Sequence, residues 1–126
     1  MAGERVLVVD DNAINLKLVQ VVLRAAGYEV ATADDAEQAR AEIGRAVPSL
    51  VLMDVQLPGT DGLKLTRELR ADPVTAHVPV VAVTSYAMCG DEAKALEAGC
   101  VAYVTKPIDI HTLPDLVATH VALRVR

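Results

Sequence analysis

Val6-Leu7-Val8-Val9-Asp10-Asp11 is the stretch that decides the fold, because four consecutive apolar residues run directly into two aspartates. An uninterrupted apolar run of this kind is typical of a strand that is buried on both faces of a parallel sheet. The pattern returns in Leu50-Val51-Leu52-Met53-Asp54, where a second apolar run ends in an aspartate. Similar runs complete a set of five predicted strands, at residues 6–9, 28–33, 50–53, 80–83 and 101–104.

Stretches with helical spacing alternate with these strands. Ile14, Leu18 and Val22 recur at four-residue intervals, and Gly27 follows as a C-cap glycine should. Three further helices are predicted at residues 36–46, 93–98 and 109–120. Another helix is predicted after Asp61, which can cap it, and carries Leu65 and Leu69. Alternation of this kind predicts parallel βαβ units with right-handed crossovers, and five units are too few for an eight-stranded barrel. We therefore predict an α/β fold, a doubly wound five-stranded parallel sheet in the flavodoxin-like order 2-1-3-4-5 with five helices, as a single domain over residues 1–126.

Composition excludes several classes of protein. The 126 residues carry a net charge of −5 and are 52% hydrophobic, which argues against disorder and against sequence-independent binding of nucleic acid. No apolar run approaches the roughly 20 residues that a membrane span needs, and no secretory leader is expected. Cys89 and Cys100 lack the spacing of a metal or redox motif. Reduced cysteines and a cytoplasmic location are the prediction.

Polar side chains gather where the predicted strands end. Ligands of open α/β sheets bind beyond the carboxyl ends of the strands. Three converging carboxylates repel one another unless a cation intervenes, and Mg²⁺ accepts oxygen ligands of this type. A carboxylate can also act as a nucleophile and form an acyl phosphate, a role that suits Asp54. The groups at these ends are Asp10, Asp11, Asp54, Thr84 and Lys106.

Each of these residues also has a plainer interpretation. Asp11 or Asn12 can cap the first helix, Thr84 can belong to a turn, and Lys106 can be a solvated charge. Their joint placement at one end of consecutive strands favours the functional interpretation. The nucleotide-binding and hydrolase motifs GxGxxG, GxxxxGK[ST] and GxSxG are absent from the sequence. The three histidines are interpreted as surface residues: His77, His111 and His120.

Several short stretches, in this order and spacing, resemble the receiver domain of two-component response regulators over essentially the whole chain. They are Val8-Val9-Asp10-Asp11-Asn12, Leu52-Met53-Asp54-Val55-Gln56-Leu57-Pro58, Asp61-Gly62, Val83-Thr84-Ser85, Ala98-Gly99 and Tyr103-Val104-Thr105-Lys106-Pro107. Gly59-Thr60 and Ser85 depart from the residues that the family often has there, without replacing an acidic residue or the lysine.

The resemblance implies a set of roles at the site. Asp54 would accept phosphate from a phosphohistidine. Mg²⁺ would be held by Asp11, Asp54 and the backbone carbonyl of Gln56, with Asp10 helping through water. Thr84 would donate a hydrogen bond to the phosphoryl group, and Lys106 would pair with it. Tyr103 matches the aromatic switch position, and Pro107 matches a proline that follows a cis peptide bond.

The resemblance also implies protein partners. Ile14 and Leu18, with Pro107 and Ile108, correspond to the patch that receives the helix bundle of a histidine kinase or histidine phosphotransfer protein. An alternative is that Leu18 is simply part of the core. Through Thr84 and Tyr103, the signal would reach the fourth helix, fifth strand and fifth helix and an unknown downstream effector protein. Polar contacts on that surface would come from Lys94, Glu97 and Asp115.

Two functional hypotheses from different classes remain. The first is a phosphoacceptor receiver in a bacterial phosphorelay, which assists only its own phosphorylation and dephosphorylation. Because the chain ends at Arg126, just after the last predicted helix, we expect no DNA-binding or enzymatic output domain to follow. Asp11-Asn12 followed by Asn15 resembles the receivers of hybrid histidine kinases and some single-domain relays. The second is a Mg²⁺-dependent phosphohydrolase or phosphotransferase that acts on a small molecule through an aspartyl phosphate. It would need an aspartate two residues after the nucleophile, where Gln56 stands.

Overall fold

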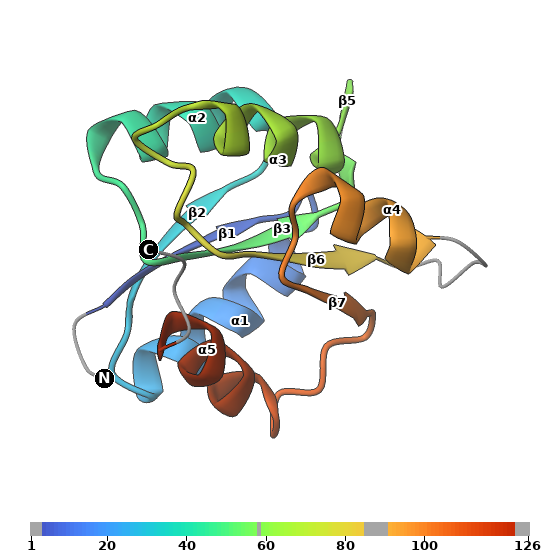
Figure 1. The fold of residues 1–126 in the computed structure, drawn as a ribbon. Coiled ribbons are helices and arrows are strands. Elements are labelled where there is room, and N and C mark those ends of the chain that lie inside the picture. The colour runs from blue at the N-terminus through green and yellow to red at the C-terminus, as the bar shows by residue number, and fades with distance from the viewer. Residues whose placement is uncertain (1–3, 58, 85–90, 123–126) are drawn as a thin grey trace.

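The computed structural model describes residues 4–57, 59–84 and 91–122 of the chain. Short parallel strands alternate with helices along the chain, as the sequence predicts (Figure 1). The elements are β1 (Arg5–Val9), α1 (Ala13–Ala25), β2 (Glu29–Ala33), α2 (Ala36–Arg45), β3 (Leu50–Asp54), β4 (Gln56–Leu57), β5 (Thr60–Asp61), α3 (Gly62–Ala71), β6 (Val80–Thr84), α4 (Asp91–Ala98), β7 (Ala102–Thr105) and α5 (Leu113–Ala122).

Five strands form one parallel sheet in the order β2-β1-β3-β6-β7. Because β6 and β7 are the fourth and fifth predicted strands, this order confirms the expected 2-1-3-4-5 arrangement. The register pairs Val9 with Met53, Asp54 with Val83, and Thr84 with Thr105, so the carboxyl ends of neighbouring strands meet at one edge of the sheet. The two-residue strands β4 and β5 form a separate antiparallel pair that the sequence analysis did not predict.

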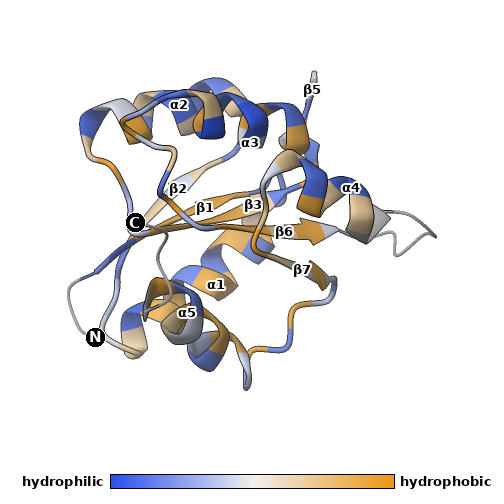
Figure 2. Cartoon of the chain, in the orientation of Figure 1, coloured by the Kyte–Doolittle hydropathy of each residue, from blue (hydrophilic) through white to orange (hydrophobic). Residues whose placement is uncertain are grey.

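Helices cover both faces of the sheet, with α2, α3 and α4 on one face and α1 and α5 on the other (Figure 1). Side chains alternate between the two layers, so Leu7 and Val9 pack under the first set of helices and Val6 and Val8 under the second. This double coverage explains why the interior strands are apolar along most of their length, as Figure 2 shows. Among the described helices, none combines the length and apolar character that crossing a bilayer requires.

Local residues set several of the helix ends. Asn12 caps α1, because its side-chain oxygen accepts hydrogen bonds from the N–H groups of Ile14 and Asn15. Gly27 follows α1 with a φ of 97°, a left-handed conformation that favours glycine and fits the predicted C-cap. Asp61 caps α3 by accepting a hydrogen bond from the N–H of Leu63, again as predicted.

The last helix begins later than the sequence pattern suggests. Residues 109–112 form turns, and α5 starts at Leu113. The Asp109 carboxylate accepts a hydrogen bond from the N–H of His111, and its carbonyl accepts one from the N–H of Leu113. An aspartate that bonds its own backbone two residues on favours a turn, which explains the shift from the predicted start at residue 109.

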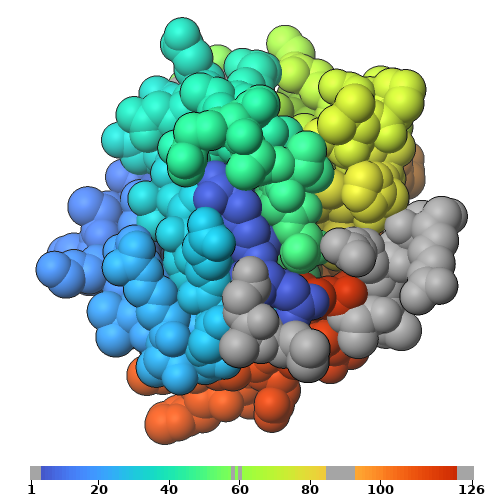
Figure 3. Space-filling model, turned by 90° about the vertical axis from the view of Figure 1, so that its left-hand side faces the viewer, coloured from blue at the N-terminus to red at the C-terminus, as the bar shows by residue number. Residues whose placement is uncertain are grey.

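The end of the sheet opposite the site is tied together by charged residues. Figure 3 views the molecule from this side, where the dark-blue start of the described chain lies between the light-blue and green segments, as a central strand requires. Arg5 of β1 donates to Glu29 at 3.3 Å and to Glu42 of α2 at 2.9 Å. These bonds join β1, β2 and α2 at the amino end of the parallel strands.

Candidate functional site

Three aspartates converge at the carboxyl edge of the sheet, at the right-hand end of the strands in Figure 1. Asp10 and Asp11 follow β1, and Asp54 is the last residue of β3 beside it. Their carboxylate oxygens lie within 4.8 Å of one another. Asp10 and Asp54 are buried, whereas Asp11 is exposed. The structure thus brings together the three carboxylates that the sequence places at strand ends.

Backbone groups hold the two buried carboxylates in place. Oδ1 of Asp54 accepts a hydrogen bond of 2.9 Å from the N–H of Gln56, two residues on. Oδ1 of Asp10 accepts a bond of the same length from the N–H of Asn12. Each N–H donor fixes one oxygen of its carboxylate and leaves the second oxygen available for other contacts.

Lys106 bridges both buried carboxylates. Its Nζ lies 3.1 Å from Oδ2 of Asp10 and 3.0 Å from Oδ2 of Asp54. The backbone also positions this lysine, since its N–H donates to the Thr84 carbonyl at 2.7 Å. The peptide bond between Lys106 and Pro107 is cis, as the sequence resemblance implies. Lys106 therefore places a positive charge next to the two buried carboxylates, Asp10 and Asp54.

Burial dominates the electrostatics of Asp54. Loss of hydration raises the pKa of this carboxyl above its usual value, and the charge of Asp10 raises it further. The N–H of Gln56 and the Lys106 ammonium act in the opposite direction without cancelling the effect of burial. Burial also pushes the pKa of Lys106 down, but its contacts with Asp54 and Asp10 outweigh that effect and leave the pKa raised.

The acidic cluster fits a hard divalent cation. Mg²⁺ binds oxygen ligands, commonly one or two carboxylates with water and phosphate oxygens completing the shell. Asp10, Asp11 and Asp54 offer three carboxylate oxygens close together, two of them on residues with little access to water. The donor set therefore suits Mg²⁺ and does not suit the softer metals that prefer sulfur or imidazole.

A cavity of about 200 Å³ adjoins the cluster and contains the two predicted switch residues. Thr84, at the end of β6, is buried, and Tyr103 of the neighbouring β7 is half-buried. The cavity thus extends from the residues that follow Asp54 to the outer strand β7 of the sheet. Its lining is Val55, Gln56, Asp61, Leu63, Thr84, Lys94 and Tyr103.

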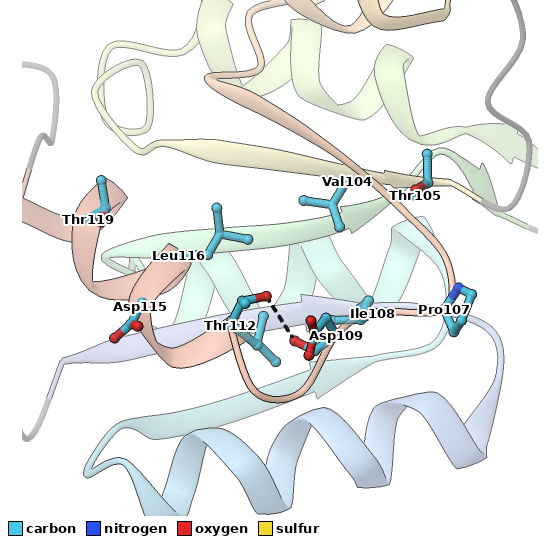
Figure 4. Close-up of a pocket in the computed structure, with 10 residues that line it drawn as sticks. Val104, Thr105, Pro107, Ile108, Asp109, Thr112, Asp115, Leu116 and Thr119 are labelled. Atoms are coloured by element: carbon cyan, nitrogen blue, oxygen red, sulfur yellow. Dashed lines mark hydrogen bonds between the residues drawn. The ribbon is translucent and has the colours of Figure 1, made fainter.

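The predicted docking residues lie beside the acidic edge. Ile14 of α1 is 79% exposed and Leu18 is 42% exposed, so the alternative that Leu18 is only a core residue is wrong. Pro107 and Ile108 line a groove of about 600 Å³ that runs along α5 (Figure 4). The Thr112 hydroxyl donates a hydrogen bond to the Asp109 carbonyl at 3.3 Å, drawn as a dashed line in Figure 4. This bond lies in the loop that connects β7 to α5.

The polar residues expected at the output surface are exposed. Lys94 and Glu97 lie exposed on α4, and Asp115 lies exposed on α5. Among the histidines, His77 and His111 are exposed and His120 is half-buried. Ser85 and Cys89 lie outside the described residues, whereas Cys100 is a buried free thiol, as predicted for a small core residue.

The sequence analysis did not identify Arg70, whose side chain connects three segments of the backbone. Arg70 of α3 donates to three backbone carbonyls, those of Gly99 at 2.9 Å, Ala76 at 3.1 Å and Val78 at 2.6 Å. Its partners are main-chain atoms in segments distant from it or beyond the helix end. Hydrogen bonds to main-chain atoms leave no pattern in the sequence. From the sequence alone, Arg70 therefore resembles any charged residue on the surface of a helix.

Comparison with known proteins agrees with this geometry. The chain is 41% identical over 105 residues to the polar-differentiation response regulator DivK of Brucella anthropi, a match that covers 83% of this chain and 85% of DivK. It is 45% identical over 105 residues to the response regulator PleD of Caulobacter vibrioides, and that match spans 83% of this chain but only 23% of PleD.

Solved structures show the same fold. The receiver domain of a sensor histidine kinase from Pseudomonas aeruginosa, with a magnesium ion in its active-site cleft, superimposes with a TM-score of 0.86 at 35% identity, covering 96% of this chain and 99% of that one. A CheY-like receiver domain protein from Methanospirillum hungatei gives a TM-score of 0.89 at 28% identity, covering 97% and 96%. The sequence pattern of the response regulator receiver domain matches residues 6–118. The chain therefore belongs to the receiver domain family, the phosphoacceptors of two-component signalling.

Proposed function

We propose that this receiver accepts a phosphoryl group on Asp54 from a phosphohistidine of a histidine kinase or histidine phosphotransfer protein. One observation carries the proposal. The buried carboxylate of Asp54 ends a central strand within an acidic cluster, and Lys106 contacts its free oxygen. Asp10 and Asp11 lie beyond the end of β1, whereas Asp54 is still part of β3 and pairs with Val83, the residue before Thr84 on the next strand.

The transfer follows from this arrangement. An oxygen of Asp54 attacks phosphorus, the P–N bond of the phosphohistidine breaks, and its electron pair returns to the imidazole nitrogen, which then takes a proton. The N–H of Gln56 keeps the carboxylate oriented for in-line attack. Lys106 balances charge on the transferred group, and the Thr84 hydroxyl donates to one of its oxygens.

Mg²⁺ is the proposed cofactor. When bound, it supplies positive charge to the phosphoryl oxygens and lowers the repulsion among the carboxylates. Asp10, Asp11 and Asp54 would hold it, with Asp10 acting through water and the Gln56 backbone carbonyl as a further ligand. The fit of the three carboxylates and the magnesium ion of the Pseudomonas receiver support this assignment.

Phosphorylation would act on partners through a shift between two packings of one fold. When Thr84 turns toward the phosphoryl group, the cavity beside it is open to the Tyr103 ring. The ring's inward movement would alter the surface of α4, β7 and α5, including Lys94, Glu97 and Asp115. An unidentified effector protein would bind that surface, whereas Ile14, Leu18, Pro107 and Ile108 would receive the phosphodonor.

The proposed role is that of a signalling domain in the bacterial cytoplasm, formed by residues 1–126 as one unit. It would assist only its own phosphorylation and dephosphorylation. An enzyme that hydrolyses a small phosphorylated molecule is disfavoured, because Gln56 stands where the second aspartate would act as a general acid and its amide cannot donate a proton in that way.

Labelling by a small phosphodonor tests the proposal. We expect acetyl phosphate with Mg²⁺ to add one base-labile phosphoryl group to the wild type, and a chelator to abolish the reaction. Asp54→Asn keeps the side-chain shape but lacks the nucleophilic oxygen and should not be labelled. Asp11→Ala should lose both Mg²⁺ binding, measured by calorimetry, and labelling. Wild-type labelling of Asp54→Asn would show that another residue is the acceptor.

A further inference from the structure

The segment that carries the phosphoacceptor is fastened to the first turn of α3. After Asp54 the chain leaves the sheet, forms the short β4–β5 pair, and returns so that the N–H of Gly62 donates to the Val55 carbonyl at 2.9 Å. On the other side, the N–H of Val55 donates to the Val83 carbonyl of β6 at 2.9 Å. Val55 is therefore held between β6 and the start of α3.

Gly62 packs against the backbone of Asp54 itself. A Cβ built on Gly62 would overlap the carbonyl oxygen of Asp54, and its next nearest atoms are the Asp54 carbonyl carbon and the Val55 Cα. All three are main-chain atoms, which cannot move aside as the tip of a flexible side chain can. Gly62 has no positive φ, so the requirement for glycine here comes from close approach and not from backbone conformation.

Thr66 fixes Gly62 from the helix side. Its Oγ1 donates to the Gly62 carbonyl at 3.0 Å, and its side chain is fully buried. The thiol of Cys100, from the loop before β7, lies 3.9 Å from the same Oγ1 and donates to it. Gly62 is thus held by a buried contact that does not depend on the loop between β4 and β5.

We propose that Gly62 and Thr66 are positioning residues for the phosphoacceptor, an inference that rests on the proposed function of Asp54. By fixing the two peptide units between Asp54 and Gln56, they set the N–H that bonds Oδ1 of Asp54. They also fix the point from which the chain continues to the Gln56 carbonyl, the proposed metal ligand. Neither residue touches the phosphoryl group. They act through the backbone of the residues that do.

Gly62→Ala tests this role, with Gly44→Ala as the matched control. Gly44 lies in α2 with open space where its Cβ would be, so its substitution should leave the site unchanged. Displacing catalytic groups by about 1 Å can cost roughly 100-fold in rate, so labelling of Gly62→Ala by acetyl phosphate should fall on that scale. Its Mg²⁺ affinity, measured by calorimetry, should fall by about tenfold or more.

A spectroscopic signal separates positioning from general destabilisation. In two-dimensional NMR the amide resonance of Gln56 reports its bond to Asp54, so it should shift in Gly62→Ala and remain in place in Gly44→Ala. A folded Gly62→Ala protein with wild-type Gln56 resonance, Mg²⁺ affinity and labelling would overturn the proposal.

Thr66 variants decide the matter if Gly62→Ala does not fold. Thr66→Val keeps the shape and removes the hydroxyl, so labelling and Mg²⁺ affinity should drop by about tenfold, and Thr66→Ser should restore them. Equal behaviour of Thr66→Val and wild type would overturn the role. If the wild type itself is not labelled, the proposed function fails, and the Mg²⁺ affinities of the same variants still decide whether these residues position the cluster.

Discussion

Lys106 is the single residue on which the charge balance of the site depends most. Its ammonium group contacts both buried carboxylates, at 3.1 Å for Asp10 and 3.0 Å for Asp54. Removal of one partner from a buried ion pair leaves an uncompensated charge, which is far more costly than the loss of an exposed pair. The lysine thus contributes to folding as well as to the proposed transfer.

Lys106→Met should therefore lower the free energy of unfolding by about 3 kcal/mol without Mg²⁺. Urea denaturation measures this loss, and added Mg²⁺ should recover more stability in the variant than in wild type, because the carboxylates then gain another cation. Lys64→Met, at an exposed position of α3, is the control and should behave like wild type. Equal stability of Lys106→Met and wild type would contradict the role of the bridge.

Cys100 provides a pH-dependent signature of its burial. Loss of hydration raises the pKa of this thiol above its usual value of 9.0, against smaller opposing effects of Thr66 and Arg70. As pH rises past that value, the unfolded chain releases the thiol proton while the folded chain keeps it. The folded state then binds more protons, so stability falls as pH rises.

In a Cys89→Ser background, the unfolding free energy should decline above the usual thiol pKa of 9.0 with a slope of up to about 1.4 kcal/mol per pH unit from this group. Cys100→Ala in the same background should lose that contribution to the slope. Urea denaturation at one pH unit below and one pH unit above the usual thiol pKa measures the two slopes of unfolding free energy against pH. Identical slopes with and without the thiol would show that Cys100 is not buried as described.

At the scale of elements, helix α1 has apolar side chains that are exposed to solvent and are not packed against the sheet. Ile14, at the end of the helix nearest the acidic cluster, is 79% exposed, and Val21, seven residues further along, is 58% exposed. Because residues seven apart return to the same side of a helix, the two positions differ mainly in their distance from the site.

Ile14→Ser should reduce phosphotransfer from a phosphorylated histidine phosphotransfer protein while labelling by acetyl phosphate stays at the wild-type rate. Loss of an exposed side chain should change stability by less than about 0.5 kcal/mol. Val21→Ser is the matched control on the same helix and should transfer normally. If Ile14→Ser loses transfer and acetyl phosphate labelling equally, the substitution damages the fold and α1 is not shown to be the docking element.

Arg70 joins α3 to the segments on either side of β6. It donates to the carbonyls of Ala76 and Val78 before the strand and to that of Gly99 after α4. Burial lowers the pKa of Arg70, so its hydrogen bonds are made at some cost in hydration. Three partly buried backbone carbonyls would lose this partner together if the guanidinium were removed.

We expect Arg70→Met to lower the free energy of unfolding by about 2 kcal/mol, since buried carbonyls left without donors are costly. Chemical denaturation of the variant is the measurement. Arg67→Met, at an exposed position on the same helix, should change stability little. A stability loss of the same size in both variants would assign the effect to helix charge and not to the bonds of Arg70.

At the scale of the whole molecule, the chemistry was easier to predict from the sequence than the packing. Asp10, Asp54, Thr84 and Lys106 each follow or end an apolar run, and parallel strands necessarily bring such ends to one edge. The order of the strands in the sheet was harder to predict, because hydrophobic periodicity identifies strands but does not identify their neighbours. The expected order rests on the element count, for which the flavodoxin-like arrangement is the natural choice.

Contacts between distant segments account for what was missed. The apolar run of β7 resembles that of a central strand, yet β7 lies at the edge of the sheet and is half-buried. The packing of Gly62 on the Asp54 backbone and the bonds of Arg70 to main-chain carbonyls leave no periodic signal. Such features depend on how elements meet, which local patterns do not encode.

The most direct test of the central claim is to locate the phosphoryl group. Borohydride reduction of the protein after treatment with acetyl phosphate and Mg²⁺ converts an aspartyl phosphate to homoserine, which peptide mass spectrometry places in the sequence. The account predicts homoserine at position 54 alone, and none when Mg²⁺ is chelated. Homoserine at position 10 or 11, or its absence from position 54, would contradict the assignment of Asp54 as the phosphoacceptor.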